Sequence, residues 1–330
     1  MDKTTDHTRR EAAPVVPADD ANLVSASRIL LDGGLVAMPT ETVYGLAADA
    51  TNGRAVASIY TAKGRPSFNP LICHVADRAM AETCAVFSPL AHALADHFWP
   101  GPLTLVLPRA ATCPVSELAT AGLDTIAVRM PKSPAALELI RLVGRPLAAP
   151  SANPSERLSP TTAAHVAENL GDRIDLILDG GVCRAGLEST IIALTKTGAA
   201  MLRPGALARS GIELLTGLLT APDPHAGIVA PGMMRRHYAP RAPLRLDAVD
   251  AREGESFLAF GAPPKGVTAS LNLSERGDLE EAASNLFAML RRLDATSNAI
   301  AVAPIPDTGL GEGINDRLKR AAARFPKDGV

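Results

Sequence analysis

Short apolar runs recur along this 330-residue chain and alternate with segments of helical pattern. Three segments, 22–32, 133–144 and 161–171, place apolar side chains at helical spacing. Buried strands that alternate with helices are typical of α/β folds, so a sheet flanked by helices is predicted, although periodicity alone does not fix the strand order. The predicted strands are TLVL (104–107), IAVRM (126–130), PLAAPSA (146–152), LILDGG (176–181) and STIIAL (189–194).

The rest of the chain suggests a linker and a second, smaller unit. Residues 35–49, LVAMPTETVYGLAAD, are interpreted as a strand that runs into a loop and then into another helix. The Pro- and Gly-rich segment 220–246 is longer than an ordinary loop, which indicates a linker. Beyond it, the pattern predicts strands at 256–261 and 299–305 and helices at 279–294 and 313–325. The predicted organisation is a flexible tail (1–19), a larger α/β domain (20–218), a linker (219–246) and a small α/β domain (247–330).

The length also suggests two domains, because a domain commonly spans about 100–200 residues. Hydrophobic residues make up 47% of the chain and charged residues 21%, which is a globular rather than a disordered composition. With 33 Lys and Arg against 35 Asp and Glu, the net charge is −2, so there is no sign of the overall basic face that proteins on polyphosphate backbones usually have. Contact with nucleic acid is therefore expected to be local or made by a partner.

The chain has four widely spaced cysteines: Cys73, Cys84, Cys113 and Cys183. They form no Cys-x-x-Cys pair, which argues against zinc ligation and against a disulfide framework. No stretch reaches the ~18–20 apolar residues that span a bilayer, and the polar N-terminal residues are not followed by the apolar region of a secretion signal. We therefore expect a soluble, cytoplasmic protein with reduced thiols and no membrane association.

The segment YTAKGRPSFNPLICH (60–74) is the first with chemical potential, because Lys63 and Arg65 flank a glycine. On extended backbone, side chains at i and i+2 point the same way, so both cations would converge on one anion. Arginine offers a planar fork to phosphate or carboxylate, and lysine supplies a compact charge. A solvated turn with two surface cations is the alternative, and the local spacing does not decide between them.

Ser151 and Asn153 are likewise two residues apart, in the Pro-bounded loop APSANPS (149–155). Their hydroxyl and amide groups would suit phosphate or ribose oxygens, or they would instead form a turn that caps a helix starting near Thr161. The loops GGVCRAGLESTI (180–191) and LRPGAL (202–207) would also offer backbone N–H groups or an arginine to an anion, although each signal is weak alone.

Two nucleotide-binding motifs are missing from the sequence. There is no G-x-x-x-x-G-K-[ST], so ATP would not be bound by a P-loop. There is also no G-x-G-x-x-G that opens a helix after a strand, which argues against a dinucleotide fold. Together with the cysteine spacing described above, the missing motifs lead us to expect no zinc, no flavin and no NAD.

Several segments taken together are more specific than any one of them, because they occur in an order that resembles the YrdC-like family. The signature of that family is a Lys-x-Arg followed far downstream by a Ser-x-Asn, here Lys63, Arg65, Ser151 and Asn153. The resemblance covers roughly residues 20–215, and the segments beyond it are similar to the linker and appended domain of the two-domain members. The segments are PTETVYGL (39–46), KGRPSFNPLICHV (63–75), WPGPLTLVL (99–107), IAVRMP (126–131), APSANPS (149–155), GLESTII (186–192) and LRPG (202–205), with PGMMRRHYAPRAP (231–243) as the linker.

The resemblance implies a twisted mixed sheet with flanking helices and a concave ligand surface, followed by a small Rossmann-like α/β domain. It also implies a nucleotidyl transfer in which L-threonine, bicarbonate or CO2, and ATP yield threonylcarbamoyl-AMP and pyrophosphate. A separate threonylcarbamoyl transferase would pass the group to the adenosine beside the anticodon of tRNA, so contact with tRNA would be indirect. Mg²⁺ is expected to arrive on ATP, without a metal site in the protein.

The resemblance further implies roles for individual residues. Lys63 and Arg65 would carry catalysis by offsetting the negative charge around the α-phosphate and the carbamate. The residues implied for ATP are Arg65, Asn69, Thr125, Ser151, Asn153, Ser159, Arg203 and Tyr238. The residues implied for L-threonine are Thr42, His74, Arg129, Ala149 and Ser189, with Arg129 on the carboxylate.

The linker would act as a lid, because the product is a mixed anhydride that hydrolyses in open water. Tyr238 would cover the nucleotide while Arg235, Arg236 or Arg241 meets phosphate. A solvated tether is the alternative interpretation of this basic cluster.

Two other functions remain open at this point. A concave basic surface would accommodate double-stranded RNA by shape, although the net charge and an aromatic content of 3% speak against this as the main role. Carbamoyl transfer in metal-cofactor maturation is the other, since similar domains occur within much longer chains. The zinc-finger cysteines expected beside such a domain are absent from this sequence.

Overall fold

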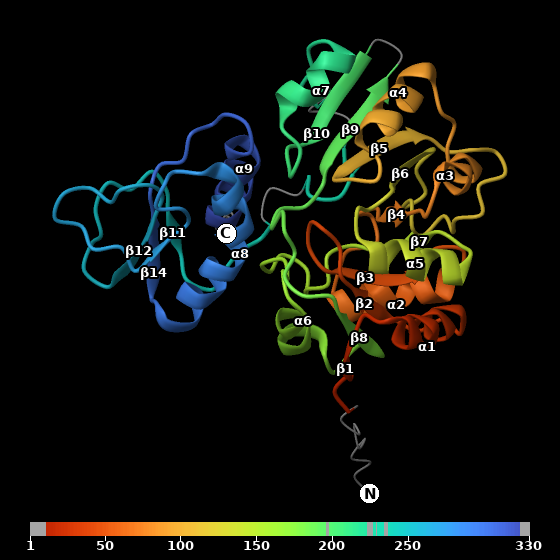
Figure 1. Ribbon diagram of the computed structural model, residues 1–330, viewed down its shortest axis with the longest axis horizontal. Helices are drawn as coiled ribbons and strands as arrows, with labels where there is room; N and C mark the ends of the chain where they lie inside the picture. The colour runs from red at the N-terminus through yellow and green to blue at the C-terminus, as the bar shows by residue number, and fades with distance from the viewer. Residues whose placement is uncertain (1–10, 196–197, 223–226, 229, 234–236, 324–330) are drawn as a thin grey trace, which may run out of the picture.

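The structure is a computed structural model that describes residues 11–195, 198–222, 227–228, 230–233 and 237–323. These residues form two units, each built on its own sheet with helices packed against it (Figure 1). The predicted α/β class, with a large mixed sheet and a smaller second sheet, is confirmed.

The strands of the larger unit are β1 (Val15–Pro17), β2 (Val36–Met38), β3 (Gly45–Asp49), β4 (Ile72–His74), β5 (Leu103–Pro108), β6 (Thr125–Arg129), β7 (Leu147–Ala148), β8 (Leu176–Asp179), β9 (Thr190–Thr195) and β10 (Gly198–Arg203). Among the described residues their order across the sheet is β1-β8-β2-β3-β7-β4-β6-β5-β9-β10. The sheet is mixed, since β4 runs parallel to β6 but antiparallel to β7.

The helices of the larger unit are α1 (Asp20–Leu31), α2 (Gly53–Lys63), α3 (Arg78–Cys84), α4 (Pro89–Phe98), α5 (Pro134–Val143), α6 (Ala163–Leu170) and α7 (Arg209–Thr216). Their limits follow from local chemistry, as α5 illustrates. The Ser133 side chain accepts a hydrogen bond from the Ala136 amide, Pro134 occupies the first turn, and Gly144 in the left-handed conformation ends the helix.

Helices cover both faces of the larger sheet. Neighbouring residues of a strand point to opposite faces, and β2 places Val36 and Met38 in one apolar cluster and Ala37 in another. The cluster of Val36 and Met38 is covered by α1 and α5, and the other by α2, α4 and α6. The loops at the strand ends remain free to carry functional side chains.

The smaller unit is a parallel sheet with two long helices. Its strands are β11 (Leu244–Arg245), β12 (Glu255–Ala259), β13 (Leu271–Asn272) and β14 (Ala299–Val302), in the order β11-β14-β12-β13, and its helices are α8 (Leu279–Thr296) and α9 (Gly311–Ala322). Figure 1 shows α8 and α9 between this sheet and the larger unit. Both helices therefore face the junction of the two units.

The two units share one apolar cluster across this junction. Val43, Leu158 and Leu187 of the larger unit belong to the same buried cluster as Leu286 and Leu290 of α8. Burial of apolar surface contributes about 25 cal/mol per Å², so the shared cluster fixes the small unit against the large one.

Four sequence-based boundaries need correction. The helix expected within 35–49 is the strand β3, which pairs antiparallel with β2 because a turn at 39–44 reverses the chain. The strand expected over 146–152 is limited to β7, since its continuation curls into the loop that carries Ser151. The tail predicted over 1–19 is too long, because β1 pairs with β8. The predicted linker over 219–246 ends earlier, because β11 pairs with β14.

None of the helices in the described ranges is long and apolar enough to cross a membrane.

Glycine permits the close approach of α8 to the larger unit. Gly186 has φ +66°, and a Cβ built there would lie 2.4 Å from the carbonyl oxygen of Ala283 and 2.5 Å from the Cα of Ser284. Both atoms belong to the backbone of α8, so they cannot yield as a flexible side chain would. Any larger residue at this position must push the helix away.

We predict that Gly186→Ala lowers the free energy of unfolding by about 1–3 kcal/mol more than Gly144→Ala does, measured by urea unfolding. Gly144 has φ +67° with open space around its Cβ position, so it reproduces the backbone strain without the clash. Equal losses in the two variants would contradict the close packing of α8.

Candidate active site

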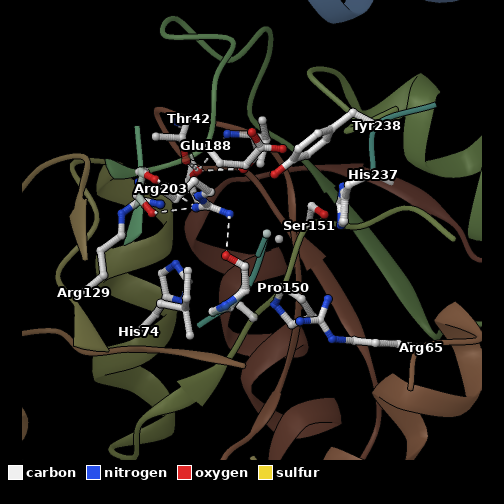
Figure 2. A pocket seen from close by; sticks show the side chains of 18 residues that line it. Thr42, Arg65, His74, Arg129, Pro150, Ser151, Glu188, Arg203, His237 and Tyr238 are labelled. Carbon is white, nitrogen blue, oxygen red and sulfur yellow. Dashed lines mark hydrogen bonds between the residues drawn. The ribbon is translucent and has the colours of Figure 1, made fainter. Parts of the chain in front are cut away.

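A small cavity lies where the loops at the ends of the central strands meet the linker. His74 ends β4 and Arg129 ends β6, and the two residues are paired in the parallel register of these strands, so their side chains lie side by side. Figure 2 shows these two side chains on one side of the cavity and His237 and Tyr238 of the linker on the other. The lining residues are Thr40, Thr42, Val43, Gly45, Arg65, Ile72, His74, Arg129, Ala149, Pro150, Ser151, Glu188, Ser189, Arg203, Pro231, Gly232, His237 and Tyr238.

Three arginines give the cavity its positive charge. Arg65, Arg129 and Arg203 are each less than 10% exposed. Arg65 donates from Nε to the Asn69 carbonyl (3.1 Å) and from Nη2 to the Pro70 carbonyl (2.9 Å). These partners are neutral, and burial lowers the pKa of Arg65 to about 10. A buried cation held by carbonyls alone favours an anion beside it.

Arg203 is held in the same way, by the start of β9. It donates from Nη2 (2.9 Å) and from Nε (3.2 Å) to the carbonyl oxygen of Ser189. Nη2 also reaches the Ser189 hydroxyl (3.3 Å), which exchanges a hydrogen bond of 2.7 Å with Thr104. The backbone of Ser189 therefore sets the direction of Arg203.

Arg129 alone among these three pairs with a carboxylate in the described structure. Its Nη2 lies 2.6 Å from Oε1 of Glu41, and its Nε donates to the Gly101 carbonyl (3.2 Å). The Glu41 side chain, 14% exposed, lies outside the cavity lining and beside a second cavity with Lys132 and Arg184. Glu41 therefore forms an ion pair with Arg129 from outside the cavity.

His74 is neutral in this setting. Burial and the adjacent Arg129 lower its pKa from 6.5 to about 3, while a hydrogen bond to the Ile72 backbone opposes the shift. Its Nδ1 is buried and has no hydrogen-bond partner among the described residues. An uncharged imidazole beside Arg129 can exchange a hydrogen bond with a ligand without adding positive charge.

The linker places two adjacent rings, tilted by 54° to each other, against the cavity. His237 and Tyr238 have ring centroids 4.0 Å apart, and both residues are buried. His237 Nδ1 and the Tyr238 hydroxyl have no hydrogen-bond partner in the described structure. Tyr238 has φ +59°, an uncommon value for a residue other than glycine. Strained backbone and unpartnered polar atoms at one place are typical of a functional element.

The free space in the cavity is about 40 Å³. Sites for small molecules usually measure about 300–1,000 Å³, whereas a water molecule occupies about 30 Å³. The cavity in this closed arrangement would hold little more than water, so a larger ligand requires the linker rings or nearby loops to move.

Nine of the predicted site residues line this cavity: Thr42, Arg65, His74, Arg129, Ala149, Ser151, Ser189, Arg203 and Tyr238. They come from seven separate stretches of the chain, so the fold brings them together. Their assignment to one ligand or another stays a prediction.

Five predicted residues do not line the cavity: Lys63, Asn69, Thr125, Asn153 and Ser159. Asn69 offers its carbonyl to Arg65, and Asn153 donates from Nδ2 to the carbonyls of Pro154 (2.8 Å) and Arg157 (2.9 Å). Ser159 donates to a carboxylate oxygen of Glu188. Thr125 starts β6, four residues before Arg129, and a rise of about 3.3 Å per residue separates the two by about 13 Å.

The extended backbone expected around Lys63 and Arg65 is wrong. Lys63 is the last residue of α2, and Gly64 follows with φ +60°, so the alternation of an extended strand does not apply to the two side chains. Lys63 Nζ donates to the carbonyls of Ser151 and Asn153, at 2.5 Å each. Lys63 therefore holds the Ser-x-Asn loop from behind, and this contact links the two signature pairs.

The alternative interpretation of that loop, in which it caps the following helix, is wrong. The Thr162 side chain accepts the hydrogen bond from the His165 amide, so neither Ser151 nor Asn153 is the cap of α6. Of the three linker arginines expected to meet phosphate, Arg235 and Arg236 lie outside the described residues. Arg241 lies outside the cavity, 3.7 Å from Asp294, with its side chain 70% exposed.

Sequence reasoning missed three polar lining residues: Thr40, Glu188 and His237. Glu188 precedes the predicted Ser189, and His237 precedes the predicted Tyr238. Thr40 accepts or donates at 2.8 Å with Thr42 and donates to the Val43 carbonyl (2.6 Å). A charged residue within the apolar run GLESTII was the available signal for Glu188.

Residues 28–205 match the family model described as "Telomere recombination", which groups Sua5, YciO and YrdC proteins. The chain belongs to the Sua5–YciO–YrdC family. Residues 206–323 match the model described as "Threonylcarbamoyl-AMP synthase, C-terminal domain". The YrdC-like resemblance and the two-domain architecture are confirmed by these two matches.

Relatives in this family match nearly the whole chain. The threonylcarbamoyl-AMP synthase of Pyrococcus abyssi is 43% identical over 317 residues, 90% of this chain and 93% of that protein. That of Bacillus subtilis is 40% identical over 325 residues, 92% and 94% of the two chains. The crystal structure of P. abyssi Sua5 complexed with L-threonine has a TM-score of 0.85 at 40% identity, covering 94% of this chain and 97% of that one.

We predict that His74 makes stability depend on pH. Because its folded-state pKa of about 3 lies below the ordinary 6.5, the unfolded chain takes up the proton first as the pH falls. The contribution is intact above pH 6.5 and is lost progressively toward pH 3, and about 2 kcal/mol of it has been lost at pH 5.

Urea unfolding at pH 7 and pH 5 checks this. The loss of stability between the two pH values should be about 2 kcal/mol smaller in His74→Asn than in the wild type. The exposed His97 provides the control, since His97→Asn should leave the pH dependence unchanged. A His74→Asn variant with the wild-type pH dependence would show that His74 is protonated as readily in the folded protein as in the unfolded chain.

Proposed function

We propose that this protein is a threonylcarbamoyl-AMP synthase. The observation that carries the proposal is a buried cavity with three arginines and a neutral histidine, in a chain that aligns along nearly its full length with synthases of that name. In this reaction the threonine amine and CO2 form a carbamate with release of a proton. If bicarbonate is the source, water is released instead of the proton.

The second step is a nucleotidyl transfer. A carbamate oxygen attacks the α-phosphorus of ATP, the bond from that phosphorus to the bridging oxygen of the β-phosphate breaks, and pyrophosphate leaves. Two unit charges about 4 Å apart repel each other by about 4 kcal/mol at an effective dielectric constant of about 20. Cations fixed before the substrates arrive offset this repulsion, so positioning and electrostatics supply most of the catalysis.

L-threonine is assigned to the side of the cavity formed by β4 and β6. Its carboxylate would replace Glu41 on Arg129, because a free carboxylate offers the guanidinium the same charge and geometry. Neutral His74 lies beside this arginine and would bond the amine or hydroxyl without repelling an ammonium group. Thr42, Ala149 and Ser189 complete this side.

ATP is assigned to the side of Arg65, Ser151 and Arg203, beneath Tyr238. Arg65 and Arg203 have carbonyl partners that phosphate oxygens would outcompete. Lys63 would add charge from behind the Ser151 loop. Roles for Asn69, Thr125, Asn153 and Ser159 in binding ATP require rearrangement around the nucleotide, since these residues lie outside the cavity as described.

The linker is assigned the role of a lid. About 40 Å³ of free space is too small for ATP and threonine, so we assign to His237 and Tyr238 an outward movement that admits the substrates and a return that covers the nucleotide. Closure excludes water from the mixed anhydride, which would otherwise hydrolyse.

The residues present suit Mg²⁺ carried by ATP. The described residues hold no cluster of three or more His, Cys, Asp or Glu suited to a metal ion, and the cavity carboxylate, Glu188, is already paired with an arginine. Mg²⁺ would therefore be held by phosphate oxygens and water, where it supplies charge neutralisation at the leaving pyrophosphate. Threonylcarbamoyl-AMP would pass to a separate transferase that acts on tRNA, so tRNA need not touch this protein.

The purified full chain is predicted to release pyrophosphate from ATP only when L-threonine and bicarbonate are both present. The assay combines pyrophosphate detection with mass spectrometry of threonylcarbamoyl-AMP, and each amino acid is tested in turn. Pyrophosphate release that does not depend on threonine, or the absence of the adenylate, would rule out the proposed function.

The ion pair of Arg129 with Glu41 predicts opposite effects on the KM for threonine. Arg129→Gln should raise it by about 10- to 150-fold, because a hydrogen bond to a charged group is worth about 1.5–3 kcal/mol. Glu41→Gln should lower it, since the amide competes less well than a carboxylate for Arg129. The KM for ATP should change less than threefold in both variants. A higher KM for threonine in Glu41→Gln would contradict competition at Arg129.

A further inference from the structure

Arg317 of α9 is a fully buried arginine that reaches from the smaller domain into the larger one. Its Nε donates to Oε2 of Glu188 at 2.8 Å, and its Nη1 donates to the Pro204 carbonyl at 2.7 Å. Nη1 also lies 2.9 Å from the carboxylate of the adjacent Asp316. One guanidinium therefore binds two segments that wall the cavity, the one before β9 and the one after β10.

Glu188 connects Arg317 to the cavity. It lines the cavity, and its second oxygen accepts a hydrogen bond from Ser159. Burial would raise its pKa, but Arg317 and Arg203 keep the pKa below the ordinary value, so the carboxylate stays charged. The next residue is Ser189, whose carbonyl directs Arg203. The position of Arg203 thus depends on a segment anchored by Arg317.

Arg317 also supports the linker ring. Its guanidinium carbon lies 5.1 Å from the centroid of the Tyr238 ring, a cation–π distance. Phe287 of α8 lies 5.7 Å from the same ring. Side chains of α8 and α9 therefore pack against the Tyr238 ring and support it at the cavity.

The packing leaves Arg317 little freedom to move. Gly313, one turn before it on α9, would bring a Cβ within 2.9 Å of the Gly205 carbonyl oxygen. Gly205 in turn would place a Cβ 2.3 Å from the carbonyl oxygen of Glu188. Backbone thus contacts backbone on both sides of the network, which fixes the distance between α9 and the cavity wall.

We propose that Arg317 is a positioning residue through which the smaller domain completes the nucleotide side of the active site. It holds Glu188 away from Arg203, so that Arg203 remains available to phosphate, and it seats the Tyr238 ring. Without Arg317, the buried Glu188 carboxylate would take Arg203 as its partner. This inference rests on the proposed function and adds a role for the smaller domain within the same site.

The test compares Arg317→Gln with a matched variant at the same junction. Arg209 of α7 pairs with Glu312 of α9, with Nη2 to Oε1 at 2.5 Å, but neither residue lines the cavity. Arg209→Gln therefore removes an ion pair between the domains without touching the Glu188 network. Thermal unfolding and gel filtration of both variants report whether the domains stay folded.

In Arg317→Gln we expect kcat/KM for ATP to fall at least 10-fold while the KM for threonine changes less than threefold. In Arg209→Gln all constants should stay within twofold of the wild type. Adding Glu188→Gln to Arg317→Gln should recover part of the loss, since it removes the carboxylate that would capture Arg203. Equal losses in Arg317→Gln and Arg209→Gln, or losses shared equally by both substrates, would overturn the proposal.

Arg317→Lys covers the case in which Arg317→Gln does not fold. Lysine keeps the charge but cannot make both the Nε and the Nη1 bonds, so kcat/KM for ATP should fall at least threefold. Wild-type kinetics in this variant would overturn the proposal.

ATP affinity measured by calorimetry separates this inference from the proposed function. The affinity should fall in Arg317→Gln and stay constant in Arg209→Gln. If the wild type binds ATP but makes no threonylcarbamoyl-AMP, the function is wrong and the role of Arg317 is still tested by the affinity. If the wild type makes the adenylate and Arg317→Gln binds ATP normally, the inference alone fails.

Discussion

The guanidinium groups of Arg65, Arg129 and Arg203 lie inside the protein, where an unpaired charge would cost several kcal/mol. Each must be surrounded by oxygen atoms, and backbone carbonyls provide most of them. Helices and strands use their carbonyls internally, so these oxygens come from loops and strand ends. The irregular segments between the central strands, with their prolines and glycines, are therefore a requirement of buried charge.

Two carboxylates balance this charge from opposite sides. Glu41 pairs with Arg129 from a neighbouring cavity, and Glu188 is held by Arg317 from the other domain. The first pairs with the guanidinium that a substrate carboxylate would bind, so it can be replaced by that carboxylate. Glu188 is fixed by hydrogen bonds from Ser159 and Arg317 and by close backbone contacts, so it is expected to stay in place when substrates bind. The positive charge is therefore balanced by one carboxylate that a substrate can replace, Glu41, and by one that remains, Glu188.

The α/β class and most helices could be predicted from sequence because their apolar spacing and caps are local signals, as in α5 and α8. The turn before β3 could not, since GLAAD suits a helix or a strand and only pairing with β2 decides. The position of Lys63 also depended on one glycine in the left-handed conformation. Short-range spacing carries no information about which carbonyls, 88 and 90 residues further along the chain, receive the ammonium group.

The candidate site was predictable chiefly through resemblance to a family, because the ordered set of motifs is far more specific than any single loop. The resemblance did not point to Glu188 or His237. It pointed instead to the residues that follow them, Ser189 and Tyr238. Whether a residue or its neighbour faces a cavity depends on strand register and on the smaller domain, and neither can be read from a motif. Arg317 lies in the tail that resembles the appended domain, where the resemblance implied no role for any residue, so its role follows only from the packing of α9.

The apolar cluster at the domain junction also bears on how this fold can be shortened. Val43, Leu158 and Leu187 are buried together with side chains of α8, so the larger domain alone would present them to water. A protein of the same fold without the second domain must carry polar or smaller residues at these positions to stay in solution. Unfolding of the second domain would likewise expose these side chains of the first, so the stabilities of the two domains are coupled in spite of their separate sheets.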